Sequence, residues 1–243
     1  MNAKVIAFGS GKGGVGKTTL ALNIGFAIAS LNKKVIVVDT DVSLPNLDLY
    51  TGLEHPMVTL LEVLNASAEV HSAIYTIQIG LDILPCGSSL QALRDVNMDN
   101  LEEIISELRN KYEYIILDVA AGLSKFSLLP MMCADEVLLI VNPDPASVSD
   151  AQKLKAVSAV ADIRIKAIIV NRYTKKYDDI GVKIGLPVIG IIPEDSAVVK
   201  SRDAKKPLIL LKPRSPSARA IMSIARKICG IPEKKSIFQR LLP

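Results

Sequence analysis

The fold of this chain is decided by the stretch Gly11-Lys12-Gly13-Gly14-Val15-Gly16-Lys17-Thr18-Thr19. An apolar run precedes this stretch and a helical apolar pattern follows it, so it joins a predicted strand to a predicted helix. Its spacing, G-x-x-x-x-G-K-[ST], is typical of a phosphate-binding loop, in which glycines let backbone N–H groups turn inward toward a polyphosphate. The alternative is a glycine-rich turn without a ligand. The spacing and its context favour a phosphate site.

The side chains of this loop are predicted to bind different parts of the ligand. Lys17 is expected to reach the β- and γ-phosphates, Thr18 to hold Mg²⁺, and the following helix to present its positive end to the phosphates. A second lysine, Lys12, is not required by the ordinary motif. It stands where a phosphate of the ligand comes closest.

The run from Lys12 to Thr19 resembles the deviant Walker A loop of the MinD/ParA family of P-loop ATPases. The resemblance implies Mg²⁺-dependent hydrolysis of ATP and an ATP-dependent homodimer. It also implies that Lys12 crosses the dimer interface to touch the nucleotide of the other subunit. Substitution of Lys12 is therefore expected to spare nucleotide binding more than turnover.

Composition and hydrophobic pattern predict one large α/β domain. Of the 243 residues, 49% are hydrophobic and 22% charged, which suffices for a sizeable core. Apolar runs recur at Val5–Phe8, Val35–Val38, Leu81–Leu84, Tyr114–Leu117, Val137–Val141, Ala167–Val170 and Val188–Ile192. Helical patterns lie between these runs. The alternation predicts a doubly wound, mostly parallel sheet with helices on both faces, the three-layer fold of P-loop NTPases.

Three local patterns place helices more closely. One face of a predicted helix collects Leu101, Ile104, Ile105, Leu108 and Tyr112. Thr59 and Glu62 have the spacing of a capping box. Ser215 and Pro216 predict the start of a helix that ends at Gly230.

Carboxylates follow two of the predicted strands directly. Asp39 and Asp41 come after Val35–Val38, and Asp118 comes after Tyr114–Leu117. Ligands of such sheets sit at the carboxyl ends of the strands, so these side chains are candidates for work on Mg²⁺ and on the attacking water. The alternative is an acidic loop that faces solvent.

The same resemblance assigns roles to these carboxylates. Residues 42–52 are similar to the MinD branch, where ParA proteins carry a Gln-Gly element, and they imply that Asp41 positions water while Asp39 supports the metal. The segment from Asp118 to Gly122 is similar to the second switch of the family, with Asp118 near Mg²⁺ and the γ-phosphate. Ala120 stands where the family carries proline, which removes a fixed φ and could loosen this switch.

The base-binding residues are predicted from a second resemblance. Asn171-Arg172-Tyr173-Thr174 follows a strand where GTPases carry Asn-Lys-x-Asp, and Thr174 replaces the carboxylate that pairs with guanine, which disfavours GTP. By resemblance Asn171 meets the adenine amino group, and the backbone of Pro193, Glu194 and Asp195 lines the base. Each could equally be a turn residue.

The segment from Asn142 to Asp150 resembles the family element that follows the fifth strand and docks regulators. Its two prolines predict a stiff loop, and a helix is expected to open at Asp150. A simple connection between strand and helix explains the same residues.

The charge of the chain is uneven. From Lys200 onward there are 12 Lys and Arg against 2 Asp and Glu, and before it 17 against 23. The C-terminal fifth is therefore the candidate surface for an anionic partner. The three cysteines share no spacing that would form a metal site, which disfavours an iron–sulfur cluster.

The last residues predict a reversible membrane anchor. We divide the chain into an ATPase domain, 1–232, and a tail, 233–243, whose apolar residues would share one side of a helix: Ile237, Phe238, Leu241 and Leu242. Burying them contributes on the order of 6–12 kcal/mol, and ordering the backbone costs roughly the same, so one tail binds weakly. Two tails on a dimer would bind together. A frayed terminus or a tail packed on the domain is the alternative.

Together these patterns predict an ATP-hydrolysing dimeric switch, cytoplasmic and peripherally bound to the cytoplasmic face of the cell membrane. By resemblance its role is spatial regulation, with placement of the division site favoured and a protein regulator of hydrolysis expected. Two alternatives stay open: a ParA-like ATPase that binds DNA, and a positioning scaffold for flagella, pili or chemosensory arrays. No run of 18 apolar residues and no signal-peptide pattern occurs.

Overall fold

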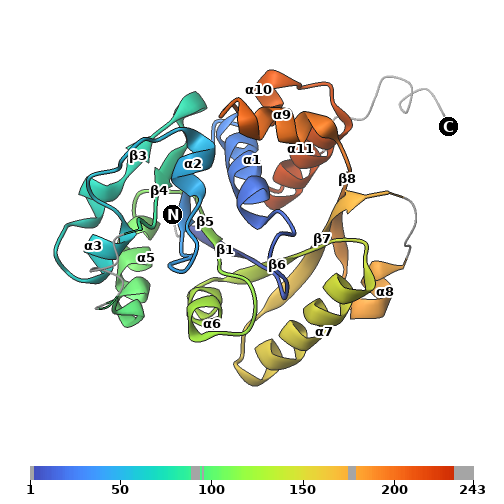
Figure 1. Cartoon of the computed structure of the whole chain (residues 1–243), viewed down its shortest axis with the longest axis horizontal. Helices are drawn as coiled ribbons and strands as arrows, with labels where there is room; N and C mark the ends of the chain where they lie inside the picture. The colour runs from blue at the N-terminus through green and yellow to red at the C-terminus, as the bar shows by residue number, and fades with distance from the viewer. Residues whose placement is uncertain (1–2, 89–93, 95, 175–178, 233–243) are drawn as a thin grey trace.

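A single eight-stranded sheet forms the centre of the computed structural model, within the residues that it describes: 3–88, 94, 96–174 and 179–232 (Figure 1). The strands are β1 (Lys4–Gly9), β2 (Val35–Asp39), β3 (Tyr75–Thr76), β4 (Asp82–Leu84), β5 (Tyr114–Asp118), β6 (Glu136–Val141), β7 (Ile165–Tyr173) and β8 (Val188–Pro193). Their order is β3-β4-β2-β5-β1-β6-β7-β8. Among the strands of the described residues, only β3, at the edge of the sheet, pairs antiparallel. The predicted doubly wound, mostly parallel sheet is confirmed.

Helices connect the strands. The α-helices are α1 (Lys17–Ala29), α2 (Leu47–Thr51), α3 (Leu60–Leu64), α5 (Leu101–Arg109), α6 (Lys125–Met132), α7 (Pro145–Val160), α8 (Ile180–Ile184), α9 (Ser196–Asp203), α10 (Leu208–Leu211) and α11 (Pro216–Ile228). Short 3-10 turns lie at Val70–Ala73, Gln78–Gly80 and Met98–Asn100. No helix of the described residues is long and apolar enough to cross a bilayer.

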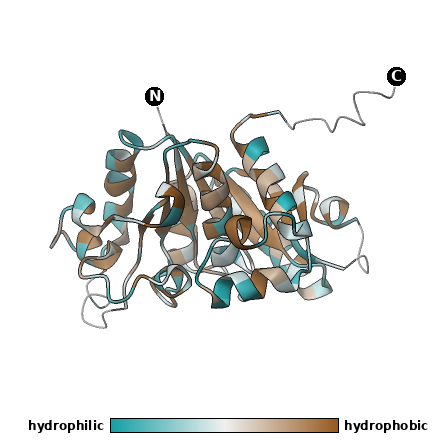
Figure 2. Cartoon of the chain, turned by 90° about the horizontal axis from the view of Figure 1, so that it is seen from above, coloured by the Kyte–Doolittle hydropathy of each residue, from teal (hydrophilic) through white to brown (hydrophobic). Residues whose placement is uncertain are grey.

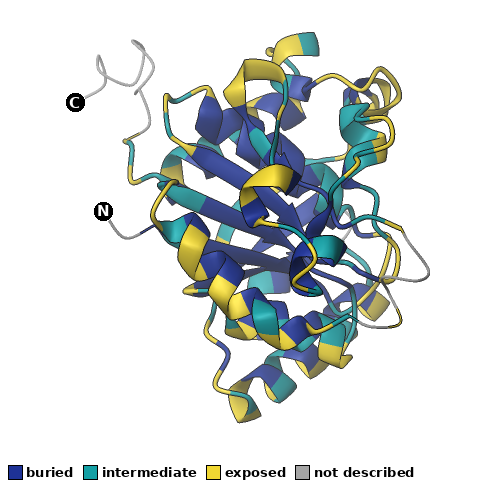
Figure 3. Ribbon diagram, turned by 90° about the vertical axis from the view of Figure 1, so that its left-hand side faces the viewer, coloured by how far each residue is buried: buried dark blue, intermediate teal, exposed yellow. Residues whose placement is uncertain are grey.

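Two helix layers bury the two faces of the sheet. In β1, Val5 and Ala7 point into one core while Ile6 and Phe8 point into the other, because side chains alternate along a strand. The first core is completed by α3, α5, α6, α7 and α8, and the second by α1, α9, α10 and α11. Figure 3 shows the buried strands between these layers, and Figure 2 shows the central strands largely in the colour of hydrophobic residues. Both faces being covered explains why the strands read as apolar runs.

The local helix predictions are confirmed. Four of the predicted apolar positions, Leu101, Ile104, Ile105 and Leu108, are buried residues of α5, and Tyr112 is buried just beyond its end. The Thr59 N–H donates to Glu62 at 2.8 Å within the capping box of α3. At α11 the Ser215 hydroxyl accepts the Ala218 N–H at 3.2 Å, and Pro216 opens the helix. Gly230 follows its end with φ 66°.

Two elements differ from the prediction. The edge strand β3 has only two residues, too few for an apolar alternation to appear in the sequence. The expected helix start at Asp150 is wrong, because α7 begins at Pro145. There Asp144 accepts the Ser147 N–H at 2.9 Å, and proline at the first position needs no N–H partner.

The carboxyl ends of β1, β5 and β2 lie side by side. Asp118 on β5 is in register with Phe8 on β1 and with Asp39 on β2. The phosphate loop leaves β1 at this edge and enters α1. The crossover to β6 on the other side of β1 opens the sheet at this point, where ligands of such folds bind.

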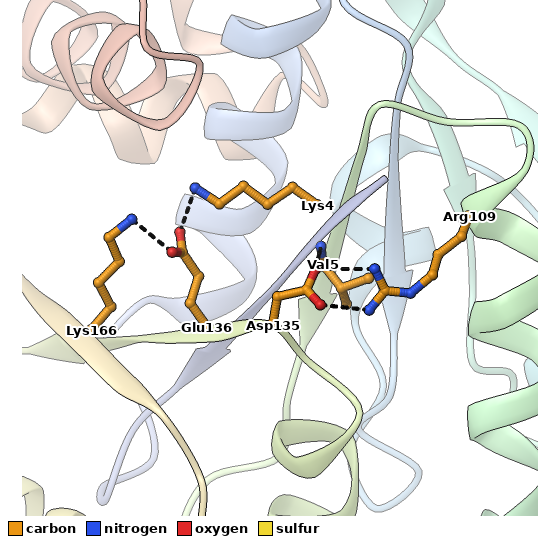
Figure 4. Close-up of polar contacts among 6 residues, drawn as sticks. All are labelled: Lys4, Val5, Arg109, Asp135, Glu136 and Lys166. Atoms are coloured by element: carbon orange, nitrogen blue, oxygen red, sulfur yellow. Dashed lines mark hydrogen bonds and ion pairs between the residues drawn. The ribbon is translucent and has the colours of Figure 1, made fainter. Parts of the chain in front are cut away.

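Charged side chains at the opposite, amino edge form complete ion pairs (Figure 4). Asp135 accepts the Val5 N–H at 2.7 Å and two hydrogen bonds from Arg109, at 2.8 and 3.1 Å. Glu136, at the start of β6, contacts Lys4 Nζ at 2.8 Å and Lys166 Nζ at 2.6 Å. Burial alone would raise the pKa of both carboxylates, but these partners lower it below the usual value. This edge of the sheet is electrostatically satisfied.

Candidate active site

The phosphate loop has glycine at positions where a side chain would not fit. Gly14 and Gly16 have φ of 76° and 96°, in the left-handed region. A Cβ on Gly16 would lie 2.6 Å from Nδ2 of Asn171, and one on Gly11 would lie 2.3 Å from the carbonyl oxygen of Asp150. Gly13 and Gly14, by contrast, have open space around them. The loop is thus packed on its inner side and bare on its outer side.

A cavity of about 430 Å³ opens over this loop. Its lining combines most of the predicted phosphate residues with both switch segments: Gly13, Gly14, Gly16, Lys17, Thr18, Thr19, Asp41, Ser43, Leu44, Asn46, Tyr50, Ala120, Ala121, Ser124, Arg172 and Arg202. Residues from five separate parts of the chain meet here. The structure therefore brings the predicted phosphate and switch residues to one site.

Two carboxylates are buried below this cavity. Asp39 and Asp118 are 1% and 2% exposed. Asp39 accepts backbone N–H groups of Asp41, Asn46 and Leu47 at 3.0, 3.2 and 3.2 Å. Burial and the neighbouring Asp118 nevertheless raise the pKa of Asp39 well above its usual value. Asp39 thus anchors the first switch segment through its contacts with three backbone N–H groups.

Asp118 is the less satisfied of the two. Burial raises its pKa to about 6, although a hydrogen bond from Thr18 and the charge of Lys17 act in the opposite direction. Its Oδ1 is buried and has no hydrogen-bond partner in the described chain. A buried carboxylate oxygen without a partner is costly, and a hydrated cation would satisfy it.

Lys17 interacts electrostatically with these carboxylates. It is 9% exposed, and burial lowers its pKa while Asp118, Asp41 and Asp39 oppose that shift. One buried lysine interacts with three carboxylates, so an additional bound cation would improve the charge balance of the site.

The donor set fits Mg²⁺ bound together with phosphates. Within the described residues, no group of three or more His, Cys, Asp or Glu side chains is arranged to hold a metal by itself. Mg²⁺ usually keeps several waters and uses one or two protein oxygens with substrate phosphates. The hydroxyl of Thr18 and the unpartnered oxygen of Asp118 supply such oxygens, with Asp39 beside them.

Asp41 lines the cavity and also shapes it. Its Oδ1 accepts the N–H groups of Ser43 and Leu44 at 3.2 and 3.0 Å, which closes a turn after β2. In the second switch segment, the Gly122 N–H donates to the carbonyl of Ser10 at 2.9 Å. Both segments are therefore tied to the sheet edge close to the phosphate loop.

A smaller cavity of about 60 Å³ adjoins the first and contains the predicted base residues, Asn171, Pro193 and Glu194. Nδ2 of Asn171 donates to the carbonyl of Val15 at 2.8 Å, so the amide also holds the phosphate loop. The side-chain oxygen remains as an acceptor for a ligand, which suits an exocyclic amino group.

Two arginines at this site were missed by the sequence analysis as ligand contacts. The two cavities share four lining residues: Gly16, Thr19, Arg172 and Arg202. Arg172 has a left-handed backbone, with φ 53°, directly after Asn171. Its place in the motif was a usable signal. Arg202 comes from α9, and nothing local in the sequence marks it, because only the packing of α9 brings it here.

Lys12 differs from the other loop lysine. It does not line the cavity of its own chain, and its side chain is 48% exposed. Its Nζ lies 3.8 Å from Asp144 Oδ1, at the limit of an ion pair between exposed groups, which contributes little. Lys12 is therefore available for contacts outside the chain.

Comparison with known proteins gives consistent relatives. A family profile described as an AAA domain matches residues 3–169. An uncharacterized ATP-binding protein of Methanocaldococcus jannaschii is 40% identical over 233 residues, covering 94% of this chain and 88% of that protein.

Solved structures agree with the sequence relatives. The septum site-determining protein MinD of Pyrococcus horikoshii, complexed with Mg-ADP, superposes with a TM-score of 0.87 at 31% identity, covering 93% of this chain and 96% of that one. A chain of the MinC:MinD cell division protein complex of Aquifex aeolicus gives a TM-score of 0.85 at 34% identity, covering 96% of this chain and 99% of that one.

Proposed function

This chain belongs to the MinD/ParA family of P-loop ATPases, and from that premise we propose that it is an ATP-dependent dimeric switch of the MinD type. As a member of the family it is an ATPase with ATP and Mg²⁺ as cofactors. The proposal adds what ATP controls: two copies join when ATP is bound and part after hydrolysis.

We assign nucleotide binding to the loop and its surroundings. The backbone of 11–16 and the Lys17 ammonium hold the phosphates, and Asn171, Pro193 and Glu194 hold the base. Thr18, Asp39 and Asp118 hold Mg²⁺, directly or through its waters. When bound, Mg²⁺ neutralises phosphate charge and favours attack by water.

Hydrolysis is assigned to groups around the same cavity. Asp41 lines the cavity on the side of the first switch and is the residue that holds the attacking water. Lys17 stabilises the negative charge that develops on the transferred phosphoryl group. Lys12 of a second copy supplies another positive charge, so hydrolysis is slow until two copies meet.

The observation that carries this proposal is the outward position of Lys12. A lysine inside a phosphate loop that does not line its own cavity is half exposed and almost unpaired. The open space at Gly13 and Gly14 leaves room for another chain there. Exposed leucines flank the cavity, Leu44 at 74% and Leu123 at 44%, which favours an apolar contact between copies.

Membrane association completes the proposed cycle. The tail residues Ile237, Phe238, Leu241 and Leu242 lie outside the described residues, so their role stays a prediction. A dimer would present two tails to an anionic membrane at the cytoplasmic face, and hydrolysis would release them. By analogy with the MinC:MinD complex, we propose a protein partner that regulates or reads this cycle, with placement of the division site as its role.

Sedimentation of the wild type, Lys12→Ala and Lys17→Ala tests the switch. With ATP and Mg²⁺ the wild type is expected to dimerise, and with ADP to remain monomeric. Lys12→Ala should bind ADP normally but fail to dimerise and hydrolyse, whereas Lys17→Ala should lose nucleotide binding. A Lys12→Ala protein that dimerises and hydrolyses like the wild type would refute the role of Lys12.

A second candidate function is ParA-like binding of DNA, favoured by the positive C-terminal part of the chain. Such binding should fall steeply as salt rises. Comparing the wild type with a chain that ends at Glu233, in ATP, separates the two functions. If only the shortened chain fails to bind vesicles, the result supports the membrane switch. If both proteins bind DNA and neither binds vesicles, the result supports the ParA-like alternative.

A further inference from the structure

A separate cavity of about 430 Å³ lies between α10 and α11, and it shares no residue with the two nucleotide cavities. Its lining residues are Ile209, Pro213, Ala218, Arg219, Met222, Ser223 and Arg226. Figure 1 shows these two helices in the layer that packs with α1 and α9. The proposed ATPase mechanism uses none of them.

Helix α11 has two different faces. Ile221, Ile224, Ala225 and Ile228 are buried against the sheet. The cavity is lined by Arg219, Met222, Ser223 and Arg226, whose spacing of three, four and seven residues puts them on one other side of the helix. Two guanidinium groups, two turns apart, therefore flank the thioether of Met222.

The remaining walls are apolar. Ile209 from α10, Pro213 and Ala218 add hydrocarbon surface, and Met222 adapts its shape readily to a ligand. A site of this kind suits a molecule with an anionic group and an apolar part.

Positive charge is concentrated in the part of the chain that forms the cavity, where Lys205 pairs with Glu54 at 3.8 Å and only Arg219 and Arg226 of the basic residues line the cavity itself. Residues 204–232 contain seven Lys and Arg and no Asp or Glu: Lys205, Lys206, Lys212, Arg214, Arg219, Arg226 and Lys227. Within the described chain, neither Arg219 nor Arg226 takes part in an ion pair with a carboxylate. Arg219 Nη1 donates to the carbonyl of Arg214 at 2.8 Å, which holds its guanidinium beside the cavity and leaves its charge unneutralised.

We propose that this cavity binds an anionic phospholipid of the membrane, with the phosphate between Arg219 and Arg226 and the adjoining apolar part against Ile209 and Met222. The inference rests on the membrane association proposed above. It adds that the protein prefers membranes that contain anionic phospholipids. Only residues 229–232 separate α11 from the tail, and five peptide steps span at most about 18 Å, so cavity and tail would reach the same membrane surface.

The apolar walls favour a lipid over a nucleic acid. DNA phosphates are bound by positive charge and hydrogen-bond donors, and that binding gains nothing from Ile209 or Met222. A lipid gains both from the two arginines and from removing hydrocarbon surface from water.

Two measurements on full-length protein test the proposal. In the first, calorimetry measures binding of short-chain dihexanoyl phosphatidylglycerol, below the concentration at which it forms micelles, with the phosphatidylcholine analogue as reference. In the second, sedimentation with Mg-ATP measures binding to vesicles of phosphatidylglycerol and phosphatidylcholine. The variants are Arg219→Gln/Arg226→Gln and Met222→Gln. The control Lys111→Gln/Arg164→Gln removes the same charge from exposed residues outside 204–232.

The arginine variant is expected to bind anionic vesicles about 30-fold more weakly, because two cations near a lipid surface each contribute roughly fivefold. It should also lose its preference for soluble phosphatidylglycerol, and Met222→Gln should weaken binding of that lipid with both arginines present. The control should change each affinity less than about threefold, and all variants should keep the circular dichroism and basal ATPase rate of the wild type.

Each contrary result has a separate meaning. Equal binding of soluble phosphatidylglycerol by the wild type and the arginine variant overturns the lipid site, whatever the vesicles show. Wild-type protein that binds the soluble lipid but no vesicle defeats the membrane switch and leaves the lipid site standing. If the arginine variant loses binding to a DNA duplex but not to phosphatidylglycerol, the surface is a nucleic-acid site and the proposal fails.

Discussion

The two edges of the central sheet hold the same kinds of charged residue in opposite electrostatic states. At the amino edge, Asp135 and Glu136 are neutralised by Arg109 and by two lysines, and their pKa values are lowered. At the carboxyl edge, burial raises the pKa values of Asp39 and Asp118 around a single buried lysine. The first arrangement stabilises the fold. The second leaves buried carboxylates that a bound cation can neutralise, as expected of a binding site.

The largest effect is expected where the carboxyl edge loses its lysine. Lys17→Gln should lower ATP hydrolysis by about 10²- to 10³-fold, because one preorganised charge on the phosphates is removed. The nucleotide-free protein should unfold at the same or a higher urea concentration, since burial disfavours the charged lysine. Steady-state ATPase rates and urea melts measure both. If Lys17→Gln clearly loses stability but keeps its activity, then Lys17 stabilises the fold and does not serve the nucleotide site.

A second test uses the opposite pKa shifts. Asp118 has a folded-state pKa near 6 against an ordinary value of 3.8, so its own contribution to the stability of the nucleotide-free protein is full below pH 4 and falls as pH rises through 6. Asp118→Asn should remove that fall and raise the free energy of unfolding at pH 7 by about 1–3 kcal/mol. Urea melts from pH 4 to 7 without nucleotide measure it.

Glu136→Gln is the matched control for that test. The pKa of Glu136 is lowered, so its contribution to stability is present above its ordinary value of 4.5 and is lost as pH falls. The glutamine variant should therefore be less stable than the wild type at pH 7 and similar to it at low pH. Parallel pH profiles for the two variants would contradict the distinction between the edges.

An ion pair at the amino edge of the sheet can be removed without changing any residue of the nucleotide site. Arg109→Ala removes two hydrogen bonds to Asp135 and one to the carbonyl of Ala3, at 2.7 Å. Asp135 is partly exposed, so we expect the free energy of unfolding to fall by only about 1–2 kcal/mol. The ATPase rate at 25 °C should not change. A rate that falls together with stability would show that the two edges are coupled.

The smallest effect is expected from substitution of Arg202, at the carboxyl edge of the sheet. Arg202 lines both nucleotide cavities, yet its only ion pair within the described chain is with its neighbour Asp203, at 3.1 Å and exposed. If Arg202 turns toward bound nucleotide, Arg202→Gln should weaken ADP binding by about 3- to 10-fold. Calorimetry at low and moderate salt measures this. Lys153→Gln, which removes an exposed partner of Asp150, serves as the control.

Sequence patterns predicted those parts of the site that are encoded within a few residues. The phosphate loop, the strand that precedes it and the carboxylates at two strand ends all have short spacings, and parallel strands of a doubly wound sheet bring their carboxyl ends together. The edge strand β3 and the start of α7 escaped the same reasoning. Strand β3 is too short for an alternation of apolar residues to appear in the sequence. At α7, Asp144 and Pro145 begin the helix within the segment that was expected to be a loop.

The sequence by itself determined the phosphate loop, the alternation of strands and helices, and the residues that follow each strand, because these depend on local spacing and on the period of apolar residues. Tertiary structure alone decided that Asp39 and Asp118 are adjacent and share one lysine, that Arg202 reaches the nucleotide cavities, and that Asp135 meets Arg109 across 26 residues. Those contacts depend on which strands pair and which helices pack, and desolvation acts on a charge only after that packing has formed.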